Sequence, residues 1–563
     1  MLRNAQPVYF IPTGLSDSID QTNAFSGACR SLQNLVFDRT DPQGLTARAG
    51  VTPFITTVQF TTYLVGISGA GATPGNVSFL SEHGSFLFGF IACVGGTHTG
   101  KDVPFIYNLV TNSLSGWAVN PVVANCPATL AGLPAANGEI PSIALVGPIL
   151  YLTHPNYAAP NFGTILTFTG AATATYAVGT TGGNALPSRP TNVASYMDRA
   201  WFATGTTVFF TDTLANNIAA VTQSLNANEG DVVVALYPLT QTQNQQGIFQ
   251  ALLSFGASGT IYQIRGNYGG SPTLTSNSLF RDQVSSSASA VGPGTITAVP
   301  NGVAFLASDG VRLINQQGVL SFLNGQVDQG QPVVDDILQP FQNCSNRPLA
   351  CATFQNGVYR ISLPTSFRGL NISGDFWYDY TRKRWNGPHT FNYNYACGWN
   401  GKTYLSSTAT GFTSQVFLSK IVTDIAAVFA DNSIAYSFDL VTANFPLNQR
   451  MEEQFLIEST VELSQTTTTQ LVYNVTAFNE ADVPLNNLTI TTTGMGSLWN
   501  GTTWGGSLWG AASHNSKPYR LSWSLPLVFN KIYFEFSGLA APGMGIKNQF
   551  YRFQDTGYML QSA

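Results

Sequence analysis

Short apolar or alternating runs, each bounded by Gly, Pro, Asn or Asp, follow one another through most of this chain and limit what it can fold into. In the stretch RAWFATGTTVFFTD, residues 199–203 predict a strand, Thr204-Gly205 a turn, and residues 207–211 the returning strand. Repetition of this pattern predicts an all-β protein that is built from hairpins.

Three further stretches predict strands of different kinds. In FWYDYTRKRWNG, residues 376–380 and 384–385 flank a turn, which predicts a second hairpin. Val358–Leu363 alternates apolar and polar residues, as a half-buried strand does. Val303–Ala307 is apolar throughout, which predicts an inner strand that is covered on both faces.

Helical periodicity is nearly absent. The clearest candidate is Pro332–Leu338, because Pro332 suits a first helical position and the apolar side chains of this stretch share one face. Pro340 would end the helix after a turn or two.

The strand pattern between about residues 50 and 430 predicts more antiparallel strands than one β-sandwich usually holds. Radial repetition accommodates that many strand edges, so we predict a β-propeller of five to seven blades, with six favoured. Two consecutive sandwiches are the alternative. The predicted domains are an extended segment at 1–50, the propeller at 51–430, and a sandwich-like domain at 431–563 that contains a Trp/Gly segment.

Charged residues make up only 9% of the 563 residues, and the formal net charge is −5. The usual charged fraction is about 25%, and a soluble monomer normally keeps its surface charged. The deficit therefore indicates a chain whose surface is largely covered by partners, or one that works outside a cell. The acidic balance argues against a nucleic-acid binder, which carries a basic footprint.

Segments that would indicate export are not found. The start, MLRNAQPVYFIPTG, lacks the basic and apolar regions of a signal peptide, and no apolar run is long enough to span a bilayer. The six cysteines show no CxxC spacing. Cys344 and Cys351 could form a bridge within a hairpin, but buried free thiols are favoured.

Residues for catalysis or metal binding do not form recognisable sets. The five histidines have no metal-ligand spacing, so we interpret them as loop or surface residues, and we predict no metal or cofactor. Adjacent carboxylates at Asp335-Asp336 and Glu452-Glu453 point different ways on a helix or strand. The motif Ser308-Asp309-Gly310 occurs once and lacks the Trp of sialidase-like turns. The sequence therefore predicts a protein that is not an enzyme.

The basic cluster Arg382-Lys383-Arg384 lies at the turn of the second hairpin. Tyr378, Tyr380 and Trp385 interleave with it, and cross-strand packing is the favoured interpretation of these rings over nucleic-acid stacking. A contact between this turn and an acidic patch on a neighbouring subunit is a second possibility.

Three tryptophans recur at intervals of five in the segment GSLWNGTTWGGSLWG, at Trp499, Trp504 and Trp509. Large rings bury much area at low entropic cost, and the intervening glycines allow close backbone approach. We interpret the segment as core packing of the C-terminal domain, ahead of an anchor on the propeller or on the next subunit.

Several short motifs together resemble one protein family. Ala28–Leu35 (ACRSLQNL) and Gly44–Gly50 (GLTARAG) resemble the opening of many phage tail proteins. Asp198–Ala203 (DRAWFA), Gly259–Ile264 (GTIYQI) and Pro300–Ile314 (PNGVAFLASDGVRLI) resemble their central hairpin and the strands after it. The 332–338 helix, the 378–385 hairpin and the Trp/Gly segment follow in the same order.

The chain thus resembles, from about residue 28 to 525, the tail nozzle or hub proteins of short-tailed bacteriophages, also called packaged-DNA-stabilisation proteins. The resemblance implies a β-propeller subunit of a hexameric ring in the virion, assembled in the host cytoplasm. That ring would lie below portal and adaptor, extend the DNA-ejection channel and dock tail fibres or spikes. Six copies would carry a charge of about −30, which would repel DNA phosphates and let DNA pass without sequence-specific binding.

Two other functions remain open at this point. A propeller could recognise host glycans on an aromatic platform such as Trp399 or Trp385. A propeller glycosidase is the weakest alternative, because repeated Asp turns and paired acids are lacking.

Overall fold

The computed structural model describes residues 6–559 apart from 17–26, 40, 42–43, 116–125, 131–138, 158–163, 169–173, 179–185, 187, 213–222, 244–246, 267–278, 324–326, 329–330, 333–340, 342–343, 345–346, 368–369, 392, 408–420, 426–428, 432, 446–451, 466–469 and 493–514. The chain forms two compact units. We call Met1–Thr52, Gly374–Phe391 and Asp424–Ala563 the sandwich unit. We call Pro53–Ser373 and Asn392–Thr423 the propeller unit.

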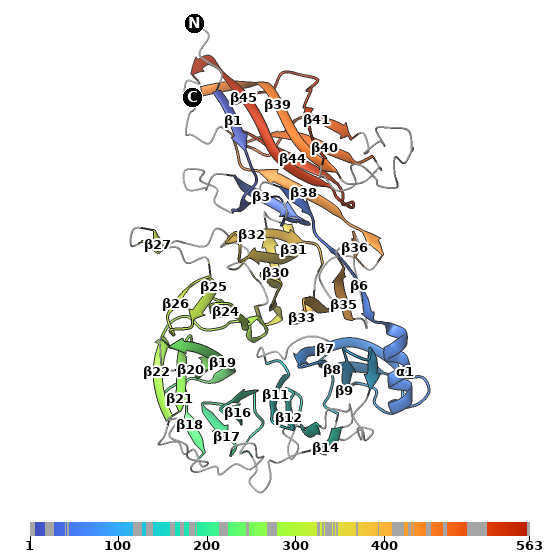
Figure 1. Ribbon diagram of the computed structural model, residues 1–563, viewed down its shortest axis with the longest axis vertical. Helices are drawn as coiled ribbons and strands as arrows, with labels where there is room; N and C mark the ends of the chain where they lie inside the picture. Colours follow the sequence, from blue (N-terminus) through green and yellow to red (C-terminus); the bar gives the residue numbers. More distant parts are fainter. Residues whose placement is uncertain are drawn as a thin grey trace, which may run out of the picture. The chain divides into compact units, whose positions relative to one another are not determined.

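Seven four-stranded sheets follow one another along the described chain (Figure 1). The first three contain β7 (Thr73–His83), β8 (Phe86–Val94), β9 (Lys101–Asn108) and β10 (Ser113–Ser115); β11 (Ser142–Val146), β12 (Ile149–Thr153), β13 (Thr164–Phe168) and β14 (Ala174–Val178); and β15 (Asn192–Tyr196), β16 (Arg199–Thr204), β17 (Thr207–Phe210) and β18 (Ser224–Asn226). The next two contain β19 (Val233–Gln243), β20 (Gly247–Gly256), β21 (Ile261–Gly266) and β22 (Leu279–Ser285); and β23 (Thr297–Val299), β24 (Gly302–Ala307), β25 (Gly310–Asn315) and β26 (Leu320–Phe322).

The last two sheets complete the series. They contain β29 (Cys351–Gln355), β30 (Val358–Phe367), β31 (Leu370–Asp379) and β32 (Arg384–His389); and β33 (Tyr393–Trp399), β34 (Lys402–Ser407), β35 (Ile421–Ile425) and β6 (Gly50–Ile55). The final sheet therefore takes its fourth strand from the start of the chain. Minor elements are the β27 (Val327–Asp328) and β28 (Gln331–Pro332) pair and the 3₁₀ turns η3 (Pro293–Thr295) and η4 (Arg347–Leu349).

The sheets of the propeller unit pack through apolar clusters that lie between neighbours. One cluster joins Tyr151 of the second sheet to Phe202 of the third, whose rings lie 5.5 Å apart. Another joins Phe255 of the fourth sheet to Phe305 of the fifth at 5.2 Å. Because β33 of the last sheet also contacts β7 of the first, the series closes on itself. The all-β propeller fold that the sequence predicted is confirmed.

Among the described residues, the propeller has seven four-stranded sheets, at the upper end of the predicted range and one more than the favoured six. The favoured count of six is wrong, because β15–β18 and β19–β22, which follow each other directly in the chain, form two separate sheets. Short, uneven strands carry no mark of where one sheet ends and the next begins, so the repeats were undercounted.

One helix, α1 (Thr57–Ser68), lies in a stretch that we expected to be strand. Its β-branched residues mask the helical pattern, and its apolar residues Phe60 and Leu64 face the interior. A capping box marks its start: the Thr56 hydroxyl accepts from the Gln59 N–H, and the Gln59 side chain accepts from the Thr56 N–H at 2.8 Å. The helix predicted at 332–338 lies almost entirely outside the described residues, apart from Pro332, which ends β28.

Two large sheets form the sandwich unit. One contains β4 (Leu35–Phe37), β5 (Leu45–Ala47), β45 (Gly545–Met559), β39 (Glu452–Gln465) and β42 (Asn515–Arg520), with β1 (Gln6–Phe10) on β45 and β43 (Val528–Phe529) on β39. The other contains β2 (Gly14–Leu15), β3 (Ala28–Gln33), β38 (Ser437–Thr442), β44 (Ile532–Leu539), β40 (Val472–Asn479) and β41 (Pro484–Thr491). A small pair, β36 (Ala430–Asp431) and β37 (Ile434–Ala435), precedes β38.

This division differs from the predicted segments 1–50, 51–430 and 431–563. The first fifty residues are not a separate extended arm, because β1, β3 and β5 each pair with a strand of the C-terminal part. Residues 374–391 also belong to the sandwich unit, although they lie in the middle of the predicted propeller. Long-range strand pairing of this kind has no local sequence signal.

The two predicted hairpins are confirmed, as β16–β17 and as β31–β32. Val303–Ala307 is buried along its whole length in β24, as predicted. Val358–Leu363 departs from its predicted alternation, because Arg360 and Ser362 are buried as well as the apolar residues between them. A strand inside a propeller is covered on both faces, so its polar positions are not necessarily exposed.

Candidate functional site

The residues of the second predicted hairpin, 376–385, all lie in the sandwich unit. They occupy the end of β31, the turn and the start of β32. The Asp379 carboxylate accepts hydrogen bonds from the Thr381 and Arg382 N–H groups at 2.8 and 3.0 Å. Lys383 takes a left-handed backbone conformation with φ 54°, and its N–H donates to the Asp379 carbonyl at 2.7 Å. These hydrogen bonds to Asp379 fix the backbone conformation of the turn that carries the basic cluster.

The aromatic residues of the hairpin pack against one another. Tyr378 and Trp385 are register partners with ring centroids 5.2 Å apart, and Tyr378 lies 5.3 Å from Tyr380. Trp385 is fully buried, and burial raises the pKa of the Tyr380 hydroxyl. The cross-strand packing interpretation therefore describes these rings, and Trp385 offers no open face to a glycan or a base.

The three basic residues have different surroundings. The Arg382 guanidinium donates to the backbone carbonyls of Asp38 and Asp41 at 2.5 and 3.3 Å, and it lies 5.1 Å from the Phe37 ring centroid. Arg382 therefore holds the segment after β4 of its own chain. Arg384 is partly buried, and Lys383 is exposed.

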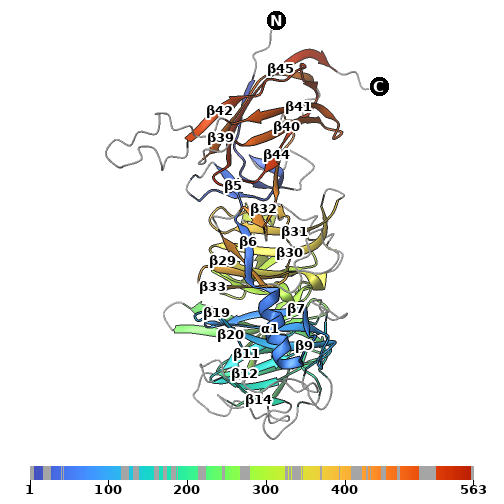
Figure 2. The same ribbon diagram turned by 90° about the vertical axis from the view of Figure 1, so that its right-hand side faces the viewer.

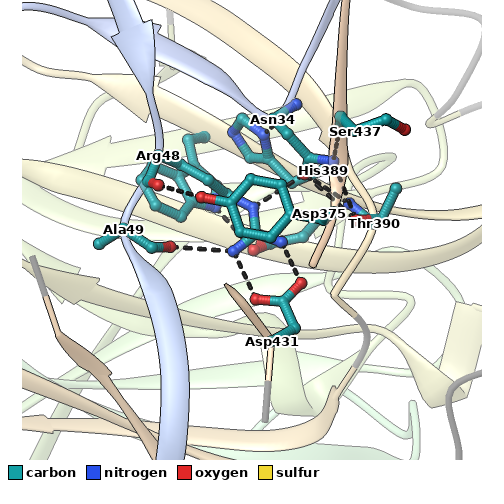
Figure 3. A network of polar contacts seen from close by, with 10 residues as sticks. Asn34, Arg48, Ala49, Asp375, His389, Thr390, Asp431 and Ser437 are labelled. Carbon is teal, nitrogen blue, oxygen red and sulfur yellow. Dashed lines mark hydrogen bonds and ion pairs between the residues drawn. The ribbon is translucent and has the colours of Figure 1, made fainter. Parts of the chain in front are cut away.

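Beside this hairpin lies a buried polar network that the sequence did not predict (Figure 3). Its centre is Arg48, whose guanidinium forms a two-pronged ion pair with the Asp431 carboxylate, one bond of which measures 2.9 Å. The Arg48 Nε donates to the Asn34 side-chain oxygen at 2.8 Å. The Arg48 guanidinium also stacks on Tyr436 at 4.2 Å, while the Tyr436 hydroxyl donates to the Arg48 carbonyl. All of these side chains are buried.

Asn34 joins this ion pair to the end of β32. Its side-chain nitrogen donates to the Ser437 carbonyl at 2.6 Å and to the Thr390 hydroxyl at 3.0 Å, and its oxygen accepts from the Thr390 N–H. The Asn34 N–H donates to His389 Nδ1 at 3.1 Å. Since Nδ1 accepts, the ring proton lies on Nε2, which donates to the side-chain amide oxygen of Asn386 at 2.9 Å. His389 is therefore a neutral structural residue here.

Three remote stretches of chain meet in this network: residues 34–49, 375–390 and 431–437. Asp375 belongs to it through Trp377, whose indole N–H donates to the Asp375 carboxylate at 2.7 Å and whose ring lies 4.6 Å from His389. The opposite charges of this buried ion pair compensate each other, and the hydrogen bonds around it hold the strands in position. Because the side chains are buried, none of their groups is available to a substrate.

The histidines correct part of a sequence-based expectation. His98, His154 and His389 are all buried, and His389 lies in β32, whereas His98 and His154 lie in loops after β8 and β12 as predicted. In the propeller unit, His154 Nε2 lies 3.1 Å from the Asp102 carboxylate, and its Nδ1 accepts from the Asn156 N–H at 3.0 Å. Burial lowers the pKa of His154, although the Asp102 carboxylate acts in the opposite direction. The pair is fully enclosed, so it resembles a catalytic dyad in composition only.

Other predicted features are placed as follows. Trp499, Trp504, Trp509 and His514 lie outside the described residues, as do Asp335 and Asp336. Cys344 and Cys351 are buried thiols that form no disulfide, so the bridge that their spacing allowed is not formed. Within the described ranges, no three His, Cys, Asp or Glu side chains gather as metal ligands would. In the same part of the chain, we find no helix whose length and apolar character would suit a bilayer span.

Sequence signals for the buried network exist but are weak. Asn34 has φ 57°, and Asn is one of the few non-glycine residues that enter this region readily. Arg48 stands alone between uncharged neighbours, in a segment that is otherwise short and apolar. Neither feature identifies a partner, because Arg48 and Asp431 are 383 positions apart.

Comparisons with known proteins add little to this description. Neither a family model nor a curated protein matches the chain. Solved structures with similarity include a "Glycoside hydrolase" (10% identity, 85% of this chain and 97% of that one, TM-score 0.25). They also include SapL1 lectin in complex with alpha methyl fucoside (11% identity, 62% and 96%, TM-score 0.26). A third is a glycoside hydrolase family 43 arabinoxylan arabinofuranohydrolase from Bacillus subtilis (11% identity, 90% and 99%, TM-score 0.19). TM-scores this low support no functional argument.

Proposed function

We propose that this chain is a structural subunit of the tail of a short-tailed bacteriophage, a nozzle or hub protein. Its copies would form a ring, with six copies expected, below the portal and adaptor. The ring would extend the channel through which DNA leaves the capsid and would dock fibres or spikes on its flank.

The observation that carries the proposal is the location of the residues on which the family resemblance rests. Asn34 comes from the first motif and Arg48 from the second, and these two side chains bond each other in the sandwich unit. The motifs at 198–203 and 300–314 supply β16 and the β24–β25 hairpin, whose residues are largely buried. The resemblance therefore lies in the scaffold, which favours a mechanical function over a catalytic one.

The low charge supports the same proposal. A chain with 9% charged residues and a net charge of −5 suits a subunit whose surface is covered in a permanent assembly. Electron microscopy and native mass spectrometry of the purified chain, alone and with a tail adaptor protein from the same genome, test the proposal. We expect rings of six copies that bind the adaptor. A chain that stays monomeric in both conditions would contradict the tail role.

Recognition of host glycans is the second candidate, and one observation keeps it open. Trp399 ends β33 at a hairpin turn formed by Asn400 and Gly401, and its side chain is only partly buried. Trp385, the other proposed platform, is buried. Binding of the wild-type chain to a glycan array, lost in Trp399→Ala and retained in Trp377→Phe, would favour this function over the ring.

A further inference from the structure

Helix α1 exposes a face that carries no charge. None of its 12 residues is charged, and no charged residue occurs between Arg48 and Glu82. Val58 is 73% exposed and Val65 40%, and Thr62 and Gly66 are exposed on the same face. A surface helix normally turns a charged or polar face outward, so this one has the composition of a covered helix.

The threonines of this region do not make it polar. The Thr62 hydroxyl donates to the Val58 carbonyl at 3.0 Å, and the Thr73 hydroxyl donates to the Val94 carbonyl at 3.1 Å. The proton of each hydroxyl is thus donated to a backbone carbonyl of the same chain. Val94, which pairs with Thr73, is 55% exposed.

The loop after Val94 connects this strand end to the helix, because the Thr97 N–H donates to the Ser68 carbonyl at 2.9 Å. The end of β8 is thus tied to the C-terminal end of α1. We call the exposed residues of α1 and of the paired ends of β7 and β8 the uncharged flank: Val58, Thr62, Val65, Gly66, Thr73 and Val94. Exposed apolar surface of this kind is typical of protein contacts.

A complementary feature lies on the fourth sheet. Phe280 is 61% exposed on β22, the last strand in the order of that sheet. The charges beside it are paired within the sheet: Arg281 with Glu229 at 3.0 Å, and Arg265 with Asp282. Phe280 is therefore an apolar side chain that projects from a locally neutralised edge.

The two features lie on opposite sides of the same unit. Figure 1 shows α1 and β22 at opposite sides of the propeller, and in Figure 2 the helix faces the viewer. A contact between two different surfaces on opposite sides repeats from copy to copy, and it closes into a ring when the rotation allows. One surface meeting its own copy would instead produce a closed pair.

We propose that Phe280 of one copy docks on the uncharged flank of the next copy, so that the chains join head to tail through their propellers. The partner is a second copy because this chain supplies both surfaces: an uncharged apolar face and an exposed ring between neutralised charges. The inference rests on the proposed ring function and names the surfaces that would build that ring.

Two variants of the full-length chain test the proposal by sedimentation velocity. Thr62→Arg puts a charge on the flank, and Phe280→Arg removes the projecting ring; both positions are exposed, so each variant is expected to fold. Each alone is expected to be monomeric at concentrations at least tenfold above those at which the wild type assembles. Val319→Arg, at a position 56% exposed on the turn before β26, is the matched control and should assemble like the wild type.

The mixture of the two variants is the decisive sample. Each retains one intact surface, so an equimolar mixture should form a heterodimer and nothing larger. Wild-type-like assembly of either variant would overturn the docking inference and leave the ring proposal intact. Two monomeric variants that fail to pair on mixing would also overturn it. A wild-type chain that is monomeric at every concentration overturns it too, and the adaptor experiment then decides the tail role separately.

Discussion

The propeller unit and the sandwich unit use charge in different ways. The propeller unit, although longer, carries 11 Lys and Arg and 12 Asp and Glu, whereas the sandwich unit carries 13 and 17. In the propeller unit, the sheets are joined by apolar clusters such as the one around Phe255 and Phe305. In the sandwich unit, a buried ion pair between Arg48 and Asp431 lies where remote segments meet.

This difference follows from connectivity. Successive propeller sheets are made of hairpins that are close in sequence, so apolar packing suffices to align them. The sandwich unit assembles from residues of three separate stretches, and apolar packing alone would tolerate shifted strand registers. We therefore hypothesise that the polar network selects the correct register, since a misplaced strand would leave Arg48 or Asn34 buried without partners.

Removal of the Asp431 carboxylate should lower the stability of the sandwich unit more than any other change considered below. In Asp431→Ala the Arg48 guanidinium stays buried without its counter-ion, which should cost about 3–5 kcal/mol. Hydrogen exchange resolved by peptide should show β38 and β39 losing protection while β16 and β24 keep theirs. The double variant Arg48→Met with Asp431→Leu should recover most of the loss. Equal loosening of both units would contradict the local role of the network.

Replacement of Asn34 tests the junction with β32. Asn34→Ala leaves the Ser437 carbonyl and the Thr390 groups with fewer partners, which should cost about 1–3 kcal/mol. Ala also fits poorly at φ 57°, so Asn34→Gly should be less destabilising than Asn34→Ala by about 1 kcal/mol. Urea unfolding followed by tryptophan fluorescence measures both variants. Equal stability of the two would show that backbone conformation contributes nothing at this position.

Acidification should reveal a titrating group in the propeller unit. Burial lowers the pKa of His83 to about 4, from an unfolded value of about 6.5. Between these values the unfolded state binds more protons than the folded state, so stability falls as the pH drops from about 6.5 to 4. The ring keeps some solvent contact, and we expect a loss of about 1–2 kcal/mol. Thermal melting at several pH values should show a shallower decline for His83→Gln, and an identical decline would contradict the assignment.

The smallest effect is expected at a surface ion pair of the propeller unit. Arg281 and Glu229 lie 3.0 Å apart with partly exposed side chains. Glu229→Ala should change stability by no more than about 1 kcal/mol, because water screens the pair. This variant is the matched control for Asp431→Ala, and a loss of similar size in both would remove the contrast between the units.

Much of the fold could be predicted from local pattern. The β16–β17 and β31–β32 hairpins follow from alternating residues around short polar turns, and the buried strand β24 follows from its unbroken apolar run. Helix α1 was missed because its β-branched residues resemble strand. Its capping box, Thr56 with Gln59, was present in the sequence and would have located its start.

The candidate site was less predictable than the fold. The sequence singled out Arg382, Lys383, Arg384 and Trp385, which the structure places at one turn, with Arg382 bonded within its own chain. It did not single out Asn34, Arg48, His389 or Asp431. These residues matter because they contact one another across long stretches of sequence, and no sequence spacing predicts such contacts.

By itself, the sequence determined that this protein is all-β, that its strands pair mainly as hairpins, and that it carries too little charge for an ordinary exposed surface. These properties are local or compositional, and so they can be read without coordinates. Only the tertiary structure decided that β6 completes the last sheet, that β1 pairs with β45, and that Arg48 meets Asp431. Such pairings join segments that are hundreds of residues apart, and their free energy comes from burial and register over the whole fold rather than from any one segment.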